Sequence, residues 1–256
     1  MTGFRAAEKG TASQLIGALR SDQFILYCQP IKPISAGADQ TGFQEILIRF
    51  LEEEEKLLPP GSFFPILESC NLMAVLDQWV IKRVIRWIDA TRRTLPARDA
   101  PRCSINLSSD SISSAGFSKF VKEQLQSSDV SAATLAFEVP ETDAAMHTAS
   151  LEILIGELRP LGCSFTLTGY SGDFVPAELL ETLGIDLVKI DAHAMSRASE
   201  NTGGADKMKT TLRMCRTLGI RTIAEFVEQP ETLETLKALG VDYAQGYGVG
   251  KPQRLT

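Results

Sequence analysis

The stretch "SFTLTGYSGDFVPAELLETLGIDLVKID" (Ser164–Asp191) contains the strand–helix–strand pattern that decides the fold. Its first five residues, Ser164–Thr168, alternate between polar and apolar side chains, as a strand with one buried face does. The segment "PAELLETLG" that follows has helical spacing, and Gly184 is well placed to end the helix. The apolar run Ile185–Asp191 is then a second strand. Strands that are joined through a helix are expected to lie parallel in one sheet.

The same pattern recurs along the rest of the chain. We predict eight strands, at Phe24–Pro30, Phe43–Phe50, Cys103–Ser108, Thr134–Val139, Ser164–Thr168, Ile185–Asp191, Ile220–Glu225 and Tyr243–Tyr247. Helical segments follow most of them, and no linker-like break interrupts the series. Repeated units of this kind over ~250 residues predict an α/β fold, a TIM-like (β/α)8 barrel in a single domain. A doubly wound open sheet is the alternative, but no Gly-rich dinucleotide fingerprint follows any of these strands. We expect a lead-in helix within residues 1–23 and the barrel over residues 24–256.

Composition and charge exclude several classes of protein. The formal net charge of −6 argues against loose attraction to nucleic acid, so we expect no DNA partner. The five cysteines are scattered and form no CxxC pair, which indicates reduced thiols rather than a disulfide framework or a zinc site. No run approaches the ~18–20 apolar residues of a membrane span, and the N-terminus lacks a signal-peptide pattern. We therefore expect a cytoplasmic protein without membrane insertion.

Polar residues gather at the carboxyl ends of the predicted strands, where barrels of this kind carry their chemistry. In chain order these residues are Glu45 and Arg49, Asn106, Glu138, Thr168 and Gly169, Lys189 and Asp191, Glu225, and Gln245. Each of them alone is more often a loop anchor or a salt-bridge partner than a ligand. Barrel closure would direct them at one point, and buried carboxylates are costly unless they are paired, protonated or bound to something. Glu and Asn oxygens with a Lys suit divalent cations and a phosphate group, which predicts a phosphodiester or phosphoryl-transfer pocket.

Several longer blocks resemble one known family. In order along the chain, they are "FILYCQPI", "FQEILIRF", "FFPILESCNLMAVLDQWVI", "INLSSDSI", "FEVPET", "IDLVKID" and "IAEFVEQPETLETLKALGVDYAQGYGVGKP". The blocks extend from Phe24 to Pro252 and resemble the EAL domain, the family of cyclic di-GMP-specific phosphodiesterases of bacterial signalling. The resemblance implies a TIM-like barrel, cyclic di-GMP as the ligand, and Mg²⁺ or Mn²⁺ as the cations of active members.

The resemblance also implies roles for individual residues. The Glu-Ala-Leu motif of the family reads Glu45-Ile46-Leu47 here. The metal ligands implied are Glu45, Asn106, Glu138 and Glu225, with Lys189 of the Lys-Ile-Asp block orienting the attacking water. The ligand-binding residues implied are Gln29, Leu47, Arg49, Asp77, Asn106, Glu138, Glu225 and Gln245.

The end of the strand Ser164–Thr168 departs from the family pattern. Active members carry Asp-Asp-Phe-Gly-Thr-Gly there, and the two aspartates hold both cations. An ungapped alignment through to the Lys-Ile-Asp block puts Thr168 and Gly169 on those aspartates, so both acidic ligands are lost. Phe226 also stands where the family has a glycine. Two adjacent cations need several anionic ligands to offset their repulsion, so we expect neither catalytic residues nor a metal cofactor in this chain.

Five further residues have simpler interpretations. Glu141 matches the Glu that steadies the loop after this strand in the family, although the loop's own motif is absent here. His147 and His193 lie outside the constellation and are expected to be surface or helix residues. Trp79 and Trp87 recur at helical spacing and are expected to pack a barrel helix against the core.

The surviving residues favour a binding protein over an enzyme. The prediction is a catalytically inactive EAL domain, a cyclic di-GMP receptor that reports occupancy to a downstream protein partner. One alternative is residual cyclic di-GMP phosphodiesterase activity, and another is an interaction scaffold that has lost nucleotide binding. The resemblance is also consistent with a homodimer and with a longer regulator that carries upstream domains.

Overall fold

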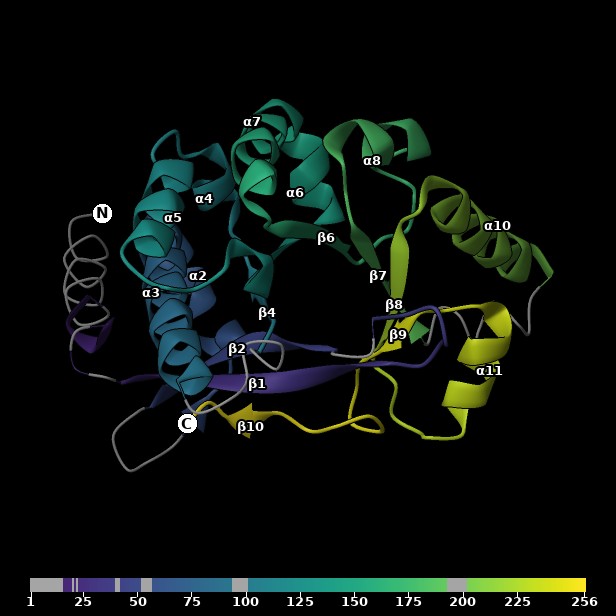
Figure 1. Ribbon diagram of the computed structural model, residues 1–256, viewed down its shortest axis with the longest axis horizontal. Coiled ribbons are helices and arrows are strands. Elements are labelled where there is room, and N and C mark those ends of the chain that lie inside the picture. The colour runs from purple at the N-terminus through teal and green to yellow at the C-terminus, as the bar shows by residue number, and fades with distance from the viewer. Residues whose placement is uncertain are drawn as a thin grey trace, which may run out of the picture.

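The strands of the chain form one sheet that closes into a barrel (Figure 1). The computed structural model describes residues 16–19, 21, 23–39, 42–51, 57–93, 101–192 and 202–256, with the backbone alone for residues 202–207. The strands are β1 (Phe24–Pro33), β2 (Phe43–Leu51), β3 (Leu57–Leu58), β4 (Cys103–Asn106), β5 (Leu135–Pro140), β6 (Ser164–Thr168), β7 (Leu187–Asp191), β8 (Arg221–Glu225), β9 (Tyr243–Ala244) and β10 (Gln253–Arg254). Within these ranges, the order β1-β2-β4-β5-β6-β7-β8-β9 returns to β1, and β3 and β10 extend the sheet from β2 and β1. The predicted eight-stranded, single-domain TIM-like barrel is confirmed.

The first strand differs from the prediction of a wholly parallel sheet. β1 runs antiparallel to both of its barrel neighbours, with eight residue pairs to β2 and two to β9. A parallel pair of consecutive strands needs a crossover of about a dozen residues or more, usually a helix. Only residues 34–42 separate β1 from β2, so the chain turns back on itself there. The neighbouring pairs from β2 through β9 are parallel, as predicted.

Helices cover the outside of the barrel and connect its strands (Figure 1). The α-helices are α2 (Phe64–Ser69), α3 (Met73–Arg92), α4 (Ser109–Ser113), α5 (Phe117–Gln126), α6 (Glu141–Met146), α7 (Thr148–Leu158), α8 (Ala177–Leu183), α10 (Thr202–Leu218) and α11 (Thr232–Leu239). Gly184 ends α8 with a left-handed φ of 68°, as its position predicts. Residues 16–19 of the predicted lead-in helix are helical, and most of that segment lies outside the described residues. Among the helices described, none is long and apolar enough to cross a membrane.

The inside of the barrel has an apolar layer at one end and a polar layer at the other. Alternate residues of a strand point to the same side of the sheet. Near the amino ends of the parallel strands, one buried cluster includes Ile31, Phe43, Leu187, Ile223 and Tyr243. Two positions nearer the barrel mouth, the same strands carry Gln29, Glu45, Lys189, Glu225 and Gln245. The apolar layer therefore closes one end of the barrel and leaves the polar side chains at its mouth.

Candidate functional site

Lys189 of β7 lies at the centre of the polar layer. Its side chain is fully buried. Its nitrogen Nζ lies 2.8 Å from Glu138 Oε2 of β5, 2.9 Å from Glu45 Oε2 of β2 and 3.6 Å from Glu225 Oε1 of β8. Side chains from four strands thus place one ammonium group among three carboxylates. We call Glu45, Glu138, Lys189 and Glu225 the lysine cluster.

Amide side chains connect the lysine cluster to β1, β4 and β9. Asn106 Nδ2 donates to Glu45 Oε1 over 2.8 Å, and Gln245 Nε2 donates to Glu45 Oε2 over 2.6 Å. Gln245 Nε2 also lies 3.3 Å from Gln29 Oε1, and Gln29 Nε2 donates to the Gly250 carbonyl oxygen over 3.0 Å. The structure therefore brings together side chains that are far apart in the sequence, as barrel closure predicts: Gln29, Glu45, Asn106, Glu138, Lys189, Glu225 and Gln245.

The three carboxylates of the cluster have different proton affinities. Burial and the neighbouring Glu45 charge raise the pKa of Glu138 to about 7, against the lowering effect of Lys189. Burial also raises the pKa of Glu225 above its ordinary value. For Glu45, burial acts in the same direction, but Lys189 and the two amides together hold its pKa below the ordinary value. Burial opposes the charge of Lys189, yet the three carboxylates raise its pKa above the ordinary value.

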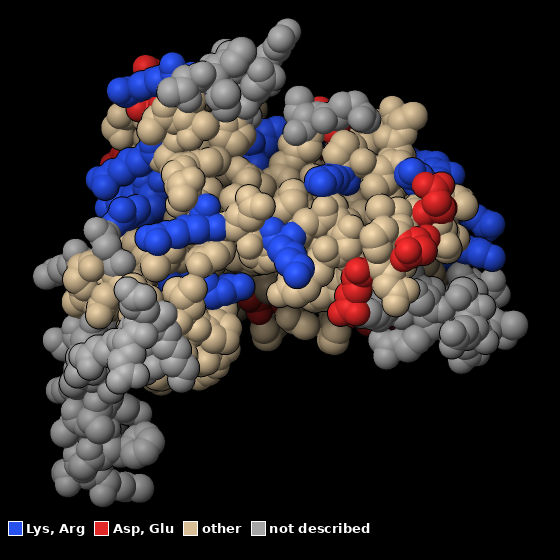
Figure 2. Space-filling model, turned by 90° about the horizontal axis from the view of Figure 1, so that it is seen from below, with Lys and Arg blue, Asp and Glu red and all other residues tan. Residues whose placement is uncertain are grey.

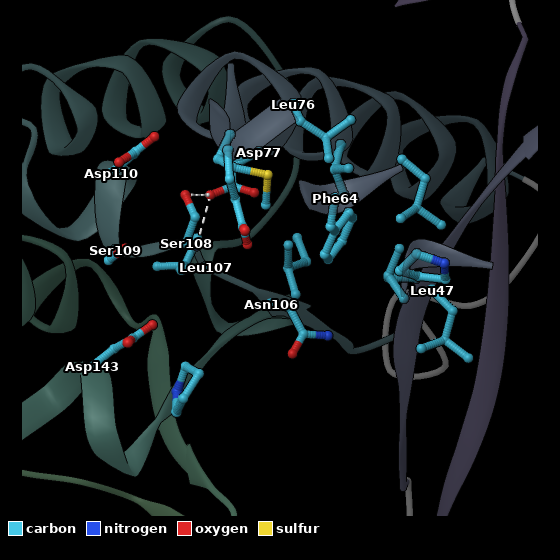
Figure 3. Close-up of a pocket in the computed structure, with 18 of the residues that line it drawn as sticks. Leu47, Phe64, Leu76, Asp77, Asn106, Leu107, Ser108, Ser109, Asp110 and Asp143 are labelled. Carbon is cyan, nitrogen blue, oxygen red and sulfur yellow. Dashed lines mark hydrogen bonds between the residues drawn. The ribbon is translucent and has the colours of Figure 1, made fainter. Parts of the chain in front are cut away.

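A pocket of about 530 Å³ adjoins the lysine cluster through Asn106, which lines the pocket and donates to Glu45 of the cluster. Figure 3 shows Asp77 of α3 and Asn106 at the end of β4 in this pocket, with Leu47 of β2 and Phe64 of α2 among its apolar walls. Its lining combines a large apolar area with a few polar groups, which is typical of small-molecule sites. Of the residues expected to bind a ligand, the pocket therefore contains Leu47, Asp77 and Asn106.

Ser108 and Ser111, which were not predicted from the sequence to be site residues, hold Asp77 in place. Asp77 Oδ2 accepts hydrogen bonds from the Ser108 backbone N–H over 2.8 Å, from Ser108 Oγ over 2.6 Å and from Ser111 Oγ over 2.7 Å. Ser108 also caps α4, where its hydroxyl accepts from the Ser111 backbone N–H. Burial raises the pKa of Asp77 despite these bonds. A serine directly before a short helix was the available signal, but the partner on α3 could not be inferred from it.

Arg49 of β2 contacts Ile48 and Tyr27. Its Nη1 donates to the Ile48 carbonyl oxygen over 2.8 Å, and its guanidinium carbon lies 5.8 Å from the ring centroid of Tyr27. Asp191 ends β7 and pairs with Glu225 of β8, where its charge contributes to the raised pKa of Glu225. Arg49 thus contacts residues of β1 and β2.

The end of β6 carries no acidic side chain. Thr168 is the last residue of the strand and pairs with Pro140 of β5, and Gly169 follows with a φ of 62°. A Cβ added to Gly169 would meet no atom within 4 Å, so the space beside this residue is open. Across the described ranges, no group of three or more His, Cys, Asp and Glu side chains is arranged to hold a metal ion.

Glu141 at the start of α6 holds the loop that follows β6. Its Oε2 accepts from the Ser171 backbone N–H over 2.7 Å and from Ser171 Oγ over 2.8 Å. Its Oε1 accepts from the backbone N–H groups of Gly172, Phe174 and Val175 over 3.0, 3.2 and 3.1 Å. The loop is therefore fixed by one buried carboxylate even though the loop motif of the family is absent.

Phe226 adopts a backbone conformation that suits glycine. It follows Glu225 directly with a φ of 58°, and its side chain is 57% exposed. The next residue fixes the turn, because the Val227 N–H donates to the Gln245 carbonyl oxygen and the Gly248 N–H donates to that of Val227. A left-handed conformation costs a non-glycine residue about 1–2 kcal/mol. The replacement of glycine noted in the sequence is thus also a point of backbone strain.

His147, Trp79 and Trp87 are not part of this site. His147 Nδ1 lies 3.1 Å from Ser113 Oγ, so it is a helix-end residue as expected, and His193 falls outside the described residues. Trp79 and Trp87 of α3 are partly buried against the core, which confirms the packing expected for them.

The chain has close sequence relatives among bacterial signalling proteins. Residues 12–252 match the family described as the EAL domain. Cyclic di-GMP phosphodiesterase PdeB of Shewanella oneidensis is 31% identical over 246 residues, which are 96% of this chain and 28% of that protein. Cyclic di-GMP phosphodiesterase PdeF of Escherichia coli is 31% identical over 243 residues, which are 95% of this chain and 32% of that protein. The chain thus spans about a third of the length of these curated relatives.

Solved structures share the same fold. The FimX EAL domain of Pseudomonas aeruginosa bound to c-di-GMP superposes with a TM-score of 0.84 at 23% identity, covering 96% of each chain. The FimX EAL domain of Xanthomonas citri in complex with c-diGMP gives a TM-score of 0.86 at 22% identity, covering 99% of this chain and 97% of that one. From the family match over residues 12–252, we conclude that the chain belongs to the EAL domain family.

Proposed function

We propose that this chain is a catalytically inactive EAL domain of the cytoplasm that binds cyclic di-GMP and reports occupancy to a protein partner. The observation that carries the proposal is the end of β6, where Thr168 and Gly169 supply no carboxylate. Without anionic ligands at this position, the two-cation chemistry implied for active members has no support there.

The remaining donors do not fit a pair of divalent cations. The formal charges of the lysine cluster sum to −2 when all three carboxylates are ionised, against +4 for two such cations. Burial further reduces the negative charge by raising the pKa of Glu138 to about 7. Both Glu45 and Glu138 also contact the Lys189 ammonium directly. We therefore derive no hydrolytic step through a metal.

Retention of the ligand is supported by the pocket rather than by the lysine cluster. Its volume of about 530 Å³ and its apolar walls suit a planar base, and the Asp77 carboxylate suits the donors on a guanine edge. The FimX EAL domains with the same fold are described as bound to this nucleotide. Arg49 would supply a phosphate contact after turning away from Tyr27.

Isothermal titration with cyclic di-GMP in the presence of a chelator tests binding. We expect saturable heat with the wild type and a clear loss of affinity with Asp77→Ala, while Asp89→Ala on the same helix serves as the matched control. Absence of heat at high micromolar protein would instead indicate the scaffold that has lost its nucleotide.

Residual phosphodiesterase activity is the second candidate, because the relatives at 31% identity are described as phosphodiesterases. A hydrolysis assay with Mg²⁺ or Mn²⁺ decides between the two. Linear product that disappears in Glu45→Ala would establish the enzyme and overturn the receptor proposal.

The double substitution Thr168→Asp/Gly169→Asp tests the reason for inactivity. Open space beside Gly169 accommodates a side chain, and Asp tolerates the left-handed φ of 62° better than most residues. We expect the double variant to bind Mn²⁺ and to gain hydrolysis. The matched control Thr168→Asn/Gly169→Asn has the same shape without the charge and is expected to gain neither.

A further inference from the structure

A second groove lies on the outer face of α3, between that helix and the start of β1. It encloses about 460 Å³ and is lined by Trp79, Arg83, Arg86 and Trp87 of α3, by the start of β1, and by Arg254 and Leu255. The helical positions 79, 83, 86 and 87 fall on one face of α3 because they are spaced by three or four residues or by whole turns. Seen from below, Lys and Arg side chains gather on the side of the molecule where α3 lies (Figure 2).

Both tryptophans of the groove donate hydrogen bonds within the chain. Trp79 Nε1 donates to the Leu19 carbonyl oxygen over 2.8 Å, and Trp87 Nε1 donates to the Thr256 carbonyl oxygen over 2.7 Å. The Arg83 guanidinium carbon lies 5.1 Å from the Trp79 ring centroid, and the Phe24 ring packs on Trp79 at 6.0 Å. The indole N–H groups and the covered Trp79 ring are therefore not available to recognise a base.

Two arginines of the groove, Arg86 and Arg254, present exposed charges. No Asp or Glu of the described chain forms an ion pair with either. At the end of the same helix, Arg92 pairs with Asp129, and Arg93, the residue after the helix, pairs with Asp89. In a chain of net charge −6, two neighbouring guanidinium groups without acidic partners are a local excess of positive charge.

The floor of the groove is apolar, which determines what kind of anion fits. Phe24, Ile25 and Leu26 of β1 and Leu255 beside β10 line it together with the arginines. A partner that satisfies both features carries carboxylates for Arg86 and Arg254 and aliphatic side chains for the floor. Nucleotides and nucleic acids fit the groove less well, because both indole N–H donors are already bonded and the Trp79 ring is covered.

We propose that this groove is a docking site for an acidic, amphipathic segment of a protein partner. Carboxylates of the partner pair with Arg86 and Arg254, and its apolar side chains pack against the β1 floor. The same helix carries Asp77 of the nucleotide pocket, so the groove and the pocket share α3. The proposal stands whether or not the pocket binds cyclic di-GMP.

The protein offers a direct readout of the groove. Trp79 and Trp87 are the two tryptophans of the chain and both line it, so intrinsic tryptophan fluorescence reports its occupancy. The probe is a synthetic 16-residue peptide of Glu and Leu in amphipathic helical order, titrated into the full chain without nucleotide. A peptide with Gln in place of every Glu controls for the apolar contribution. We expect saturable quenching by the acidic peptide and about tenfold weaker binding of the neutral one.

Charge reversal tests the two arginines. We expect Arg86→Glu/Arg254→Glu to weaken binding of the acidic peptide by about tenfold or more. The matched control Lys209→Glu/Arg213→Glu reverses two exposed charges on α10 and is expected to leave binding within about twofold. Thermal unfolding by circular dichroism verifies that both variants remain folded.

Several outcomes would overturn the proposal. These are absence of quenching by the acidic peptide, an equal loss in the α10 control, and equal binding of the neutral peptide. A DNA oligonucleotide or vesicles of phosphatidylcholine and phosphatidylglycerol that quench the tryptophans through the same two arginines would assign the groove to another class of partner. A dimer in sedimentation velocity that dissociates in Arg86→Glu/Arg254→Glu would assign it to a second copy of the chain.

Discussion

Replacing Lys189 with methionine should destabilise the barrel strongly, because it removes the cation shared by three buried carboxylates. Its Nζ lies within 2.8–3.6 Å of Glu138, Glu45 and Glu225, and methionine fills a similar volume without the charge. Breaking a buried ion pair by removing one partner typically lowers the free energy of unfolding by about 3–5 kcal/mol. At this chain length about 2–4 °C of melting temperature correspond to 1 kcal/mol, so the expected decrease is about 6–20 °C.

The measurement is thermal and urea unfolding followed by circular dichroism, in a buffer with chelator so that bound cations do not contribute. Lys237→Met is the matched control. Lys237 Nζ also lies 2.8 Å from a carboxylate, Glu234 Oε1, but these two side chains are 44% and 80% exposed. Exposed pairs contribute about 0–1 kcal/mol, so the control should barely change the melting temperature.

The pH dependence separates an electrostatic cause from a packing cause. Without Lys189, the pKa values of the three carboxyls rise in the folded state. The folded state then binds more protons than the unfolded state, so acidification favours folding. The difference from wild type should therefore be largest near pH 8 and become smaller on acidification to about pH 5. A loss below about 1 kcal/mol, or a loss that does not depend on pH, would show that the carboxylates do not rely on Lys189.

Three further substitutions test individual features. Glu138→Gln should raise the melting temperature near pH 8 and change it much less near pH 5. The folded-state pKa of Glu138 is raised from its ordinary value to about 7, so its ionisation costs stability increasingly between those two values and in full above about pH 7. A fluorimetric pH series in chelator measures this, and an equal effect at pH 5 and pH 8 would contradict it. Phe226→Gly should stabilise the chain by about 1 kcal/mol by relieving the left-handed φ of 58°, whereas a decrease in melting temperature would mean that the exposed ring has a packing role. Glu141→Ala should destabilise the loop at residues 171–175 by about 3 kcal/mol, seen as faster amide exchange and proteolysis there, and unchanged protection would refute the anchoring role.

The barrel could be predicted because its signal is repeated and local. Each unit such as Ser164–Asp191 contains a strand, a helix and a further strand within one short stretch, and closure follows from the number of units. The predicted direction of β1 was wrong, because the direction depends on the short connection at residues 34–42 rather than on the strand itself. A period-two apolar pattern is the same for either direction.

The site could be predicted in its membership but not in its contacts. The sequence predicts that Glu45, Glu138 and Lys189 are strand residues, and the barrel topology places them together at one end of the barrel. The position of Arg49 beside Tyr27 and the serines that hold Asp77 depend on side-chain rotamers and on α3 packing. The strain at Phe226 could not be predicted from the sequence either, because the φ of Phe226 is set by the turn that the bonds to Gln245 and Gly248 fix.

Closure of the barrel depends on contacts between the first strand and segments far along the chain. Gln29 contacts Gln245 and Gly250, partners separated from it by 216 and 221 positions. A ribosome-bound chain in which β9 has not yet emerged lacks both partners, as well as the strand against which β1 closes the barrel. The mouth of the barrel therefore assembles only after β9 has been synthesised, and any ligand held there selects closed barrels over open ones.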